Sequence, residues 1–292
     1  MKSRVLTGII LLGSLLLSLL LLRTFWYNLI IAFLIGAAVF EIFGSINATK
    51  SKLLLGLCLS FALIAPFLNI GTTLLEFLPP FYRLIFGGFP LVETFFVFTV
   101  IFLCALLTLH RRVDIAKAGL VYMLTVAISL SLSCLVYVRN LAFADGVYFF
   151  YVALIFAGSW WTDVGAYLMG RLFGKHKLSP LISPNKTIEG AIGGIVFCVG
   201  LFVAFGIVYD KYFLLDATAN LWLLALLAIP CAIAAMLGDL FFSMVKRSCQ
   251  IKDFGSIMPG HGGFCDRFDS MIFVAPLIFF VGKYLTSFII VR

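Results

Sequence analysis

A polar segment near the C-terminal end of the chain, residues 243–269, contains the residue types that handle phosphate groups. Counting Asp239 just upstream, it gathers four cations and four carboxylates, namely Lys246, Arg247, Lys252 and Arg267, and Asp239, Asp253, Asp266 and Asp269. Mg²⁺ takes oxygen ligands, typically one or two carboxylates together with substrate phosphates, and Lys and Arg neutralise the remaining phosphate charge. The segment therefore predicts a site for a metal-bound polyphosphate. Asp266 and Asp269 lie three residues apart, which predicts that they open the following helix on one face.

A glycine-rich run, Gly260-His261-Gly262-Gly263, lies within this segment. Glycines leave backbone N–H groups free to approach an anion closely, so we expect Gly262 and Gly263 to lie at the substrate. His261 is flanked by glycines, and both a role in the site and a loop hydrogen bond are open for it. For any single charged residue of the segment, the alternative is a charge that sets membrane topology or caps a helix.

Asp239 lies near the end of an apolar segment, where a carboxylate is costly and needs a partner. Three polar residues share its helical face: Ser243, Lys246 and Arg247. A place in the site and a structural ion pair with Lys246 or Arg247 are the two interpretations.

Asp163 lies within another apolar segment, with Tyr167 and Gly170 following on its helical face. It is a candidate for the substrate pocket, and an interhelical hydrogen bond is the competing interpretation.

A second polar stretch, residues 174–190, also predicts an anion site. Ser183 followed by a proline indicates a helix N-cap with proline at the first helical position. Lys186 and Thr187 would then lie in the first turn, where N–H groups and the helix dipole attract anions, and an ordinary capped helix is the alternative. Glu189 could bind a metal, pair with Lys186 or complement the dipole.

The elements that position these residues are membrane-spanning helices. The chain of 292 residues is 63% hydrophobic and only 12% charged, with a mean hydropathy of +1.16, whereas soluble domains carry about 25% charged residues. Since a spanning helix needs about 20 apolar residues, we predict an all-α, polytopic integral membrane protein with about nine transmembrane helices. The predicted spans are residues 5–22, 25–44, 53–72, 91–109, 117–138, 147–169, 188–209, 220–242 and 270–290.

The distribution of Lys and Arg predicts the orientation. With the N-terminus in the cytoplasm, fifteen of these residues fall on the inner side and five on the outer side, as the positive-inside rule requires. Residues 73–90, rich in Pro and Gly, are expected to form a re-entrant or interfacial excursion, and a tenth span is the alternative. The net charge of +8 lies in short loops, which argues for anionic lipids or nucleotide phosphates and against nucleic acid.

The two halves of the chain differ in polarity. Residues 1–140 are apolar helices without a recognisable motif, and residues 141–292 contain the polar groups within helices and the two polar loops. We therefore expect an N-terminal set of transmembrane helices, followed in the sequence by a C-terminal catalytic region.

Residues 243–269 closely resemble the signature of the phosphatidate cytidylyltransferase (CDP-diacylglycerol synthase) family. The matching positions are Ser243, Val245, Lys246, Arg247, Lys252, Asp253, Gly255, Pro259, His261, Gly262, Gly263, Phe264, Asp266, Arg267 and Asp269. Met258 departs conservatively from the family's usual Leu, Ile or Phe. Residues 183–190 and Asp163 with Tyr167 and Gly170 look like two further family elements, so the resemblance covers residues 158–270.

The resemblance implies a reaction in which CTP and phosphatidic acid give CDP-diacylglycerol and pyrophosphate. It implies Mg²⁺ as cofactor, with a second cation left open, and a homodimer. The modest size of the chain favours a bacterial inner membrane, and the distribution of Lys and Arg predicts an active site on the cytoplasmic face. The metal ligands by analogy are Asp239 and Asp266. The catalytic candidates are Lys246, Arg247, Lys252, Asp253, His261, Arg267 and Asp269. The substrate-binding candidates are Asp163, Ser183, Lys186, Thr187, Glu189, Ser243, Gly262 and Gly263.

Two other functions compete with this interpretation. A CDP-alcohol phosphotransferase would carry paired aspartates on one helix, and the nearest imitation, Asp145-Gly146, lacks the rest of that pattern. A transporter would use Asp163 and Asp239 as coupling-ion sites. The sequence shows no paired inverted halves, however, and its polar groups cluster at one membrane face.

Overall fold

The structure is a computed structural model that describes residues 20–46, 51–68, 91–111, 113–142, 147–213, 218–255 and 262–291. Within these ranges the protein is all-α and polytopic, as predicted. Six helices are long and apolar enough to cross a membrane: Trp26–Ser45, Leu91–Leu109, Ile115–Leu141, Tyr148–Phe173, Ile188–Tyr212 and Leu221–Ser248. Most of the first predicted span, 5–22, and the whole stretch 73–90 lie outside the described residues. The total of nine spans and the orientation of the N-terminus therefore stay predictions.

The chain divides into two compact units. The first unit comprises Met1–Ala144 and Ile251–Arg267, and the second comprises Asp145–Gln250 and Phe268–Arg292. The polar segment 243–269 is thus shared between the units. Its middle part belongs with the N-terminal helices, although it follows the second unit's long helix directly in the sequence.

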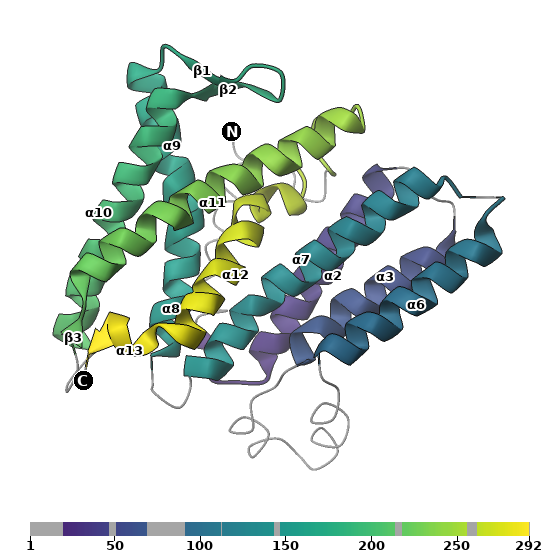
Figure 1. The fold of residues 1–292 in the computed structure, drawn as a ribbon, viewed down its shortest axis with the longest axis horizontal. Helices are drawn as coiled ribbons and strands as arrows, with labels where there is room; N and C mark the ends of the chain where they lie inside the picture. The colour runs from purple at the N-terminus through teal and green to yellow at the C-terminus, as the bar shows by residue number, and fades with distance from the viewer. Residues whose placement is uncertain are drawn as a thin grey trace. The chain divides into compact units, whose positions relative to one another are not determined.

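The first unit is built on helix α2 (Trp26–Ser45), which packs against both α3 (Lys52–Ile64) and α7 (Ile115–Ala142) (Figure 1). The short 3₁₀ turn η1 (Ala65–Phe67) continues α3, and α6 (Leu91–Leu109) packs on α3. These helices are almost entirely apolar, so they bury side chains against one another and expose others, as helices in a bilayer do.

Arg139 joins α7 to the start of α2. The side chain is fully buried, and all five of its N–H groups donate hydrogen bonds to neutral acceptors. The acceptors are the side chains of Asn28 and Asn140 and the carbonyl oxygens of Leu22 and Thr24. Arg139 therefore links the two helices, because satisfying every donor offsets much of the cost of burying the charge.

The second unit is a chain of packed helices. The helix α8 (Tyr148–Phe156) runs through a π-helical turn, η2 (Ala157–Trp161), into α9 (Thr162–Phe173). Then α10 (Ile188–Tyr212) packs on both α9 and α11 (Leu221–Ser248), and α12 (Asp269–Tyr284) packs on α11 and α8 (Figure 1). Near the C-terminus, α13 (Thr286–Ile289) leads into β4 (Ile290–Val291), which pairs with β3 (Thr218–Ala219). A π-helical turn marks a functional position in many helices, and here it ends two residues before Asp163.

A β-hairpin connects α9 to α10. Its strands are β1 (Lys177–Ser179) and β2 (Ser183–Thr187), with Lys177 opposite Thr187 and Ser179 opposite Ser183. The predicted N-cap at Ser183 is therefore wrong. Pairing with β1 holds residues 183–187 extended, and a residue before proline avoids the helical region in any case. The true N-cap is Thr187, whose hydroxyl accepts a hydrogen bond from the Gly190 N–H at 3.1 Å, so neither Lys186 nor Thr187 lies in the first turn.

The prediction for the start of the last long helix is half right. Asp269 is the first residue of α12, but Asp266 lies in the separate 3₁₀ turn η3 (Cys265–Arg267) of the first unit. The side chain of Asp266 accepts hydrogen bonds from the backbone N–H groups of Phe254 and Gly263. These bonds hold Asp266 in the turn.

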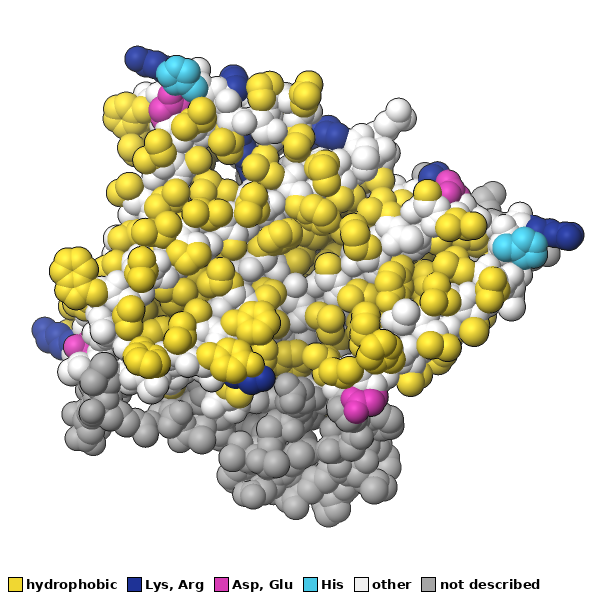
Figure 2. All heavy atoms as spheres, in the orientation of Figure 1, with side chains coloured by type: hydrophobic (Ala, Val, Ile, Leu, Met, Phe, Trp, Pro, Cys, Tyr) yellow, Lys and Arg dark blue, Asp and Glu magenta, His cyan; other side chains and the backbone are white. Residues whose placement is uncertain are grey.

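The surface is largely apolar. Figure 2 shows hydrophobic side chains over most of the visible face, with Lys, Arg, Asp, Glu and His mostly toward its margins. Large apolar residues such as Trp222 (88% exposed) and Leu107 (74% exposed) point outward from the helices. This distribution fits helices that face lipid, in agreement with the composition.

Candidate functional site

The centre of the second unit's polar groups is an ion pair between Lys186 and Asp239. The Lys186 Nζ lies 2.5 Å from Asp239 Oδ2, and both side chains are about one-quarter exposed. Ser243, one turn further along α11, donates a long hydrogen bond of 3.4 Å to the other oxygen of Asp239. Asp239 thus forms an ion pair with a lysine of the β-hairpin, whereas the structural alternative named Lys246 or Arg247 as its partner. The pair joins two segments that are more than fifty residues apart in the sequence.

Two further aspartates face this pair from α9 and α12. The Ser270 hydroxyl donates to Asp163 Oδ2 at 2.9 Å, and the Ser270 N–H donates to Asp269 Oδ1 at 2.7 Å. Asp163 and Asp269 are both close enough to Asp239 for their negative charges to interact. Ser270 was not among the predicted site residues, but it links two of them, Asp163 and Asp269.

Lysines balance these carboxylates. Lys186 attracts Asp163 as well as Asp239, and the buried Lys246 on α11 attracts Asp269. We call Asp163, Lys186, Asp239, Lys246 and Asp269 the aspartate–lysine cluster. Mixed charges in a partly buried place hold one another in position, and they can exchange partners when a charged ligand arrives.

The oxygen donors of the cluster suit a hard cation such as Mg²⁺, which prefers carboxylates and keeps several further oxygen ligands. Within the described ranges, however, no three His, Cys, Asp or Glu side chains are arranged to hold a metal ion. Lys186 supplies the positive charge beside Asp239 in this structure. The donor chemistry fits Mg²⁺, and the carboxylates would have to draw closer around it.

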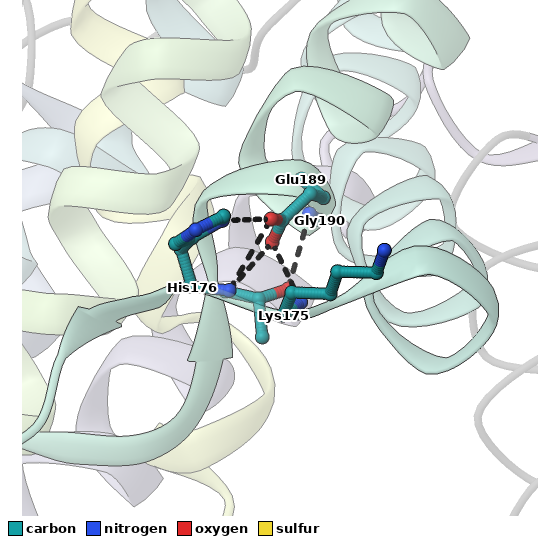
Figure 3. A network of polar contacts seen from close by, with 5 residues as sticks. Lys175, His176, Glu189 and Gly190 are labelled. Atoms are coloured by element: carbon teal, nitrogen blue, oxygen red, sulfur yellow. Dashed lines mark hydrogen bonds and ion pairs between the residues drawn. The ribbon is translucent and has the colours of Figure 1, made fainter.

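Glu189 closes the base of the hairpin. Its carboxylate accepts hydrogen bonds from the backbone N–H groups of Lys175 (3.1 Å) and His176 (3.2 Å) and pairs with His176 Nδ1 at 2.6 Å (Figure 3). Of the three roles open for Glu189, pairing with Lys186 is therefore replaced by pairing with His176. No role was predicted for His176, and its separation of thirteen residues from Glu189 carries no helical or strand periodicity that could have revealed the contact.

The first unit holds the glycine-rich part of the signature, and Asp266 organises it. Asp266 Oδ2 accepts hydrogen bonds from the Phe254 N–H at 3.1 Å and from the Gly263 N–H at 3.2 Å. The N–H of Gly263, expected to be available to a substrate anion, is thus engaged by the protein's own carboxylate. Gly262 has a φ of +81°, a backbone conformation that other residues adopt only with strain.

Glu41 is a residue of this region that sequence reasoning missed. It lies on α2, is 4% exposed, and accepts a hydrogen bond from the Cys265 N–H at 2.9 Å. The signal was present, because an ionisable residue inside an apolar segment of membrane length is a functional candidate by default. Without a motif around Glu41, nothing in the sequence connected it to residues more than two hundred positions away.

The remaining predicted residues fall into three groups. Asp163, Lys186, Asp239, Ser243, Lys246 and Asp269 come together in the second unit, with Ser183, Thr187 and Glu189 on the adjoining hairpin and helix start. Asp253, Gly262, Gly263 and Asp266 come together in the first unit. Arg247, Lys252 and Arg267 are exposed, and His261 lies outside the described residues.

Known proteins resemble this chain in sequence. A family model described as the cytidylyltransferase family matches residues 2–285. Phosphatidate cytidylyltransferase of Staphylococcus haemolyticus is 48% identical over 135 residues, which are 46% of this chain and 49% of that protein. The enzyme of the same name from Staphylococcus epidermidis is 48% identical over 128 residues, covering 44% and 47% of the two chains, and that of Staphylococcus aureus strain COL gives the same identity and coverage. The chain spans about half the length of the curated relatives it matches. Since the family model extends over nearly all of its 292 residues, the protein belongs to the cytidylyltransferase family.

Proposed function

We propose that this protein is a phosphatidate cytidylyltransferase, which transfers CMP from CTP to phosphatidic acid and releases CDP-diacylglycerol and pyrophosphate. Membership of the cytidylyltransferase family supports a CTP-dependent transfer, and relatives at 48% identity carry the name of this enzyme. The observation that carries the proposal is the ion pair of Lys186 with Asp239. It places residues 183–190, one of the family-like sequence elements, beside Asp239, and the hydrogen bond from Ser243 to Asp239 connects this pair to the start of the signature.

In the proposed reaction, a phosphate oxygen of phosphatidic acid attacks the α-phosphorus of CTP. A new P–O bond forms, the bond from the α-phosphorus to the oxygen bridging to the β-phosphorus breaks, and pyrophosphate leaves with that electron pair. The nucleophile is already an anion, so the reaction needs no strong general base. Catalysis then consists mainly of aligning two anionic substrates and neutralising their charge.

The cluster in the second unit supplies groups for both tasks. Lys186 and Lys246 can move their positive charge from the aspartates to substrate phosphates. Ser243 and Ser270 hold Asp239 and Asp163, respectively, through hydrogen bonds, which limits the orientations of these carboxylates. Bound Mg²⁺ would supply positive charge at the phosphates, and its proposed ligand in this unit is Asp239. The proposal of Asp266 as a further ligand, like the role of His261, rests on the family resemblance.

The membrane setting of the reaction is part of the proposal. The excess of Lys and Arg in one set of loops, fifteen against five, supports a cytoplasmic active site, and the staphylococcal relatives support a bacterial cell membrane. A homodimer is proposed from the family resemblance alone. The lipid substrate would enter sideways from the bilayer, since its acyl chains have no reason to leave it.

Purified protein in detergent with Mg²⁺, CTP and phosphatidic acid tests the proposal directly. The expected products are CDP-diacylglycerol and pyrophosphate in equal amounts, detected by chromatography of radiolabelled CTP. Asp239→Asn and Asp266→Asn should each lose more than about 99% of the activity, as loss of a charged group at a reacting phosphate usually does. The matched control is Asp210→Asn, because Asp210 accepts a hydrogen bond from the Ala219 N–H at the other end of α10. Absence of product across several detergents and added lipids would refute the assignment.

A further inference from the structure

Glu41 is a buried carboxylate in a helix of otherwise apolar character, and α2 itself does not explain it. Of the twenty residues of α2, Glu41 alone is acidic and none is basic. An ionisable side chain in such a helix is costly and persists where it binds a polar partner or serves a function. The partner in this case is a loop that the chain reaches only two hundred residues later.

The carboxylate of Glu41 lies against both arms of that loop, residues 251–255 and 262–267. It accepts the hydrogen bond from the Cys265 N–H on the second arm. A Cβ atom on Gly263 would lie 2.9 Å from Glu41 Oε2, and a Cβ atom on Gly255, on the first arm, would collide with the carboxylate. Two glycines of the signature therefore leave the space that Glu41 fills.

Asp266 ties together the same two arms from within the loop. It accepts hydrogen bonds from Phe254 on the first arm and Gly263 on the second. A Cβ atom on Gly263 would also lie 2.6 Å from Asp266 Oδ2, so both carboxylates pack directly on the backbone there. Asp266 therefore links the two arms to each other, and Glu41 links them to α2.

We propose that Glu41 is a positioning residue. It holds the two arms of the loop, residues 251–255 and 262–267, in place, and so keeps the charged side chains of these arms in position. Those side chains include Lys252, Asp253 and Arg267, all of which are exposed. Glu41 acts through the backbone of the loop, by the hydrogen bond from the Cys265 N–H. The catalytic part of this inference rests on the proposed function, whereas the part that concerns loop position does not.

The native Cys265 provides a test that needs no activity. Its side chain is fully buried beside the N–H group that Glu41 holds. In protein whose other cysteines are replaced by serine or alanine, maleimide should modify Cys265 slowly. Glu41→Ala should raise the modification rate about tenfold, since removing the acceptor of a buried N–H destabilises the closed loop by a corresponding amount. Glu41→Gln keeps a carbonyl acceptor of nearly the same shape and should restore the slow rate.

Asn28→Ala is the matched control for general damage to α2. Asn28 lies on the same helix and is fully buried, but its partners are Arg139 and the Pro66 carbonyl oxygen. Asn28→Ala should lower the thermal stability of the protein, and maleimide should still modify Cys265 slowly. Equal modification rates for Glu41→Ala and the parent protein would overturn the proposal. An equally large rise in the modification rate of Cys265 in Asn28→Ala would also overturn it. The same holds if Cys265 reacts as fast in Glu41→Gln as in Glu41→Ala.

Turnover separates this inference from the proposed function. In the wild-type background, Glu41→Ala should lower kcat for CDP-diacylglycerol formation about tenfold, with Glu41→Gln close to the wild type. A normal kcat in Glu41→Ala would refute the catalytic part. If the wild type forms no product while Cys265 still responds to Glu41→Ala, the proposed function fails and the positioning role stands.

Discussion

The charge balance around Asp239 depends on Lys186. Three aspartates of the cluster repel one another, and Lys186 forms an ion pair with one of them. A lysine in this position can neutralise a carboxylate in the resting protein and a phosphate during the reaction. At the residue scale, then, removal of Lys186 should affect catalysis strongly and the stability of the fold little.

Lys186→Met should lower kcat/KM for CTP about a hundredfold, because the site loses a cation from a place where phosphate charge must be neutralised. The stability of the protein should change little, since a partly exposed ion pair contributes little to folding. Steady-state kinetics and thermal unfolding in detergent measure the two effects. Lys177→Met is the control, as Lys177 is an exposed lysine on β1 of the same hairpin. Equal kinetics for the two variants would remove Lys186 from the site.

At the scale of the elements, close contact between α9 and α10 brings the hairpin to its place. Gly190 is where they approach closely, because a Cβ atom there would lie 2.8 Å from the Ala166 carbonyl oxygen and 3.1 Å from the Gly170 Cα. Both neighbours are backbone atoms, which cannot move aside without shifting a helix. Small residues at such crossings are typical of membrane helices.

Gly190→Ala should therefore destabilise the protein by about 1–3 kcal/mol, the usual cost of overpacking. Gly200→Ala, on the same helix, is the control, because a Cβ atom at Gly200 meets no atom within 4 Å. There the higher helix propensity of alanine should leave stability unchanged or raise it by up to about 1 kcal/mol. Thermal unfolding midpoints of the two variants in one detergent make the comparison. A Gly190→Ala midpoint at or above that of Gly200→Ala would contradict the close packing.

The helices were the part of the fold that the sequence could predict. Seven of the predicted spans, from 25–44 to 220–242, coincide with helical segments within a few residues at most ends, because a bilayer demands long apolar helices and leaves few alternatives. The hairpin at 177–187 was missed, since its strands are short, polar and paired only through the backbone. For the same reason, the N-cap of α10 was predicted at Ser183 instead of at Thr187.

The candidate site was predictable in its residue types and less so in its partners. Helical spacing placed Asp239 and Ser243 together correctly. The contacts of Asp239 with Lys186, of Glu189 with His176, and of Glu41 with Cys265 are tertiary. No local periodicity encodes such contacts, so a single sequence could indicate which groups needed partners but not which partners they would find.

At the scale of the whole molecule, α10 provides a test of orientation. It has 25 residues, so it is about 37 Å long and exceeds the roughly 30 Å hydrocarbon core of a bilayer. Lys175 precedes its start and Lys211 lies near its end, and the positive-inside rule assigns these two lysines to opposite sides. With the N-terminus in the cytoplasm, the hairpin and the aspartate–lysine cluster lie at the cytoplasmic end of the helix, where CTP is available.

Cysteines introduced at Lys175 and at Lys211, each in a background without other cysteines, should therefore label from opposite sides. We expect the cysteine at 175 to react with a membrane-impermeant maleimide only in inside-out vesicles, and that at 211 only in intact spheroplasts. The physical reason is that α10 is too long and too apolar to leave the bilayer, so its two ends cannot share a side. Reaction of both positions from one side would contradict a spanning α10. Reaction with the sides exchanged would refute the predicted orientation and place the cluster away from cytoplasmic CTP.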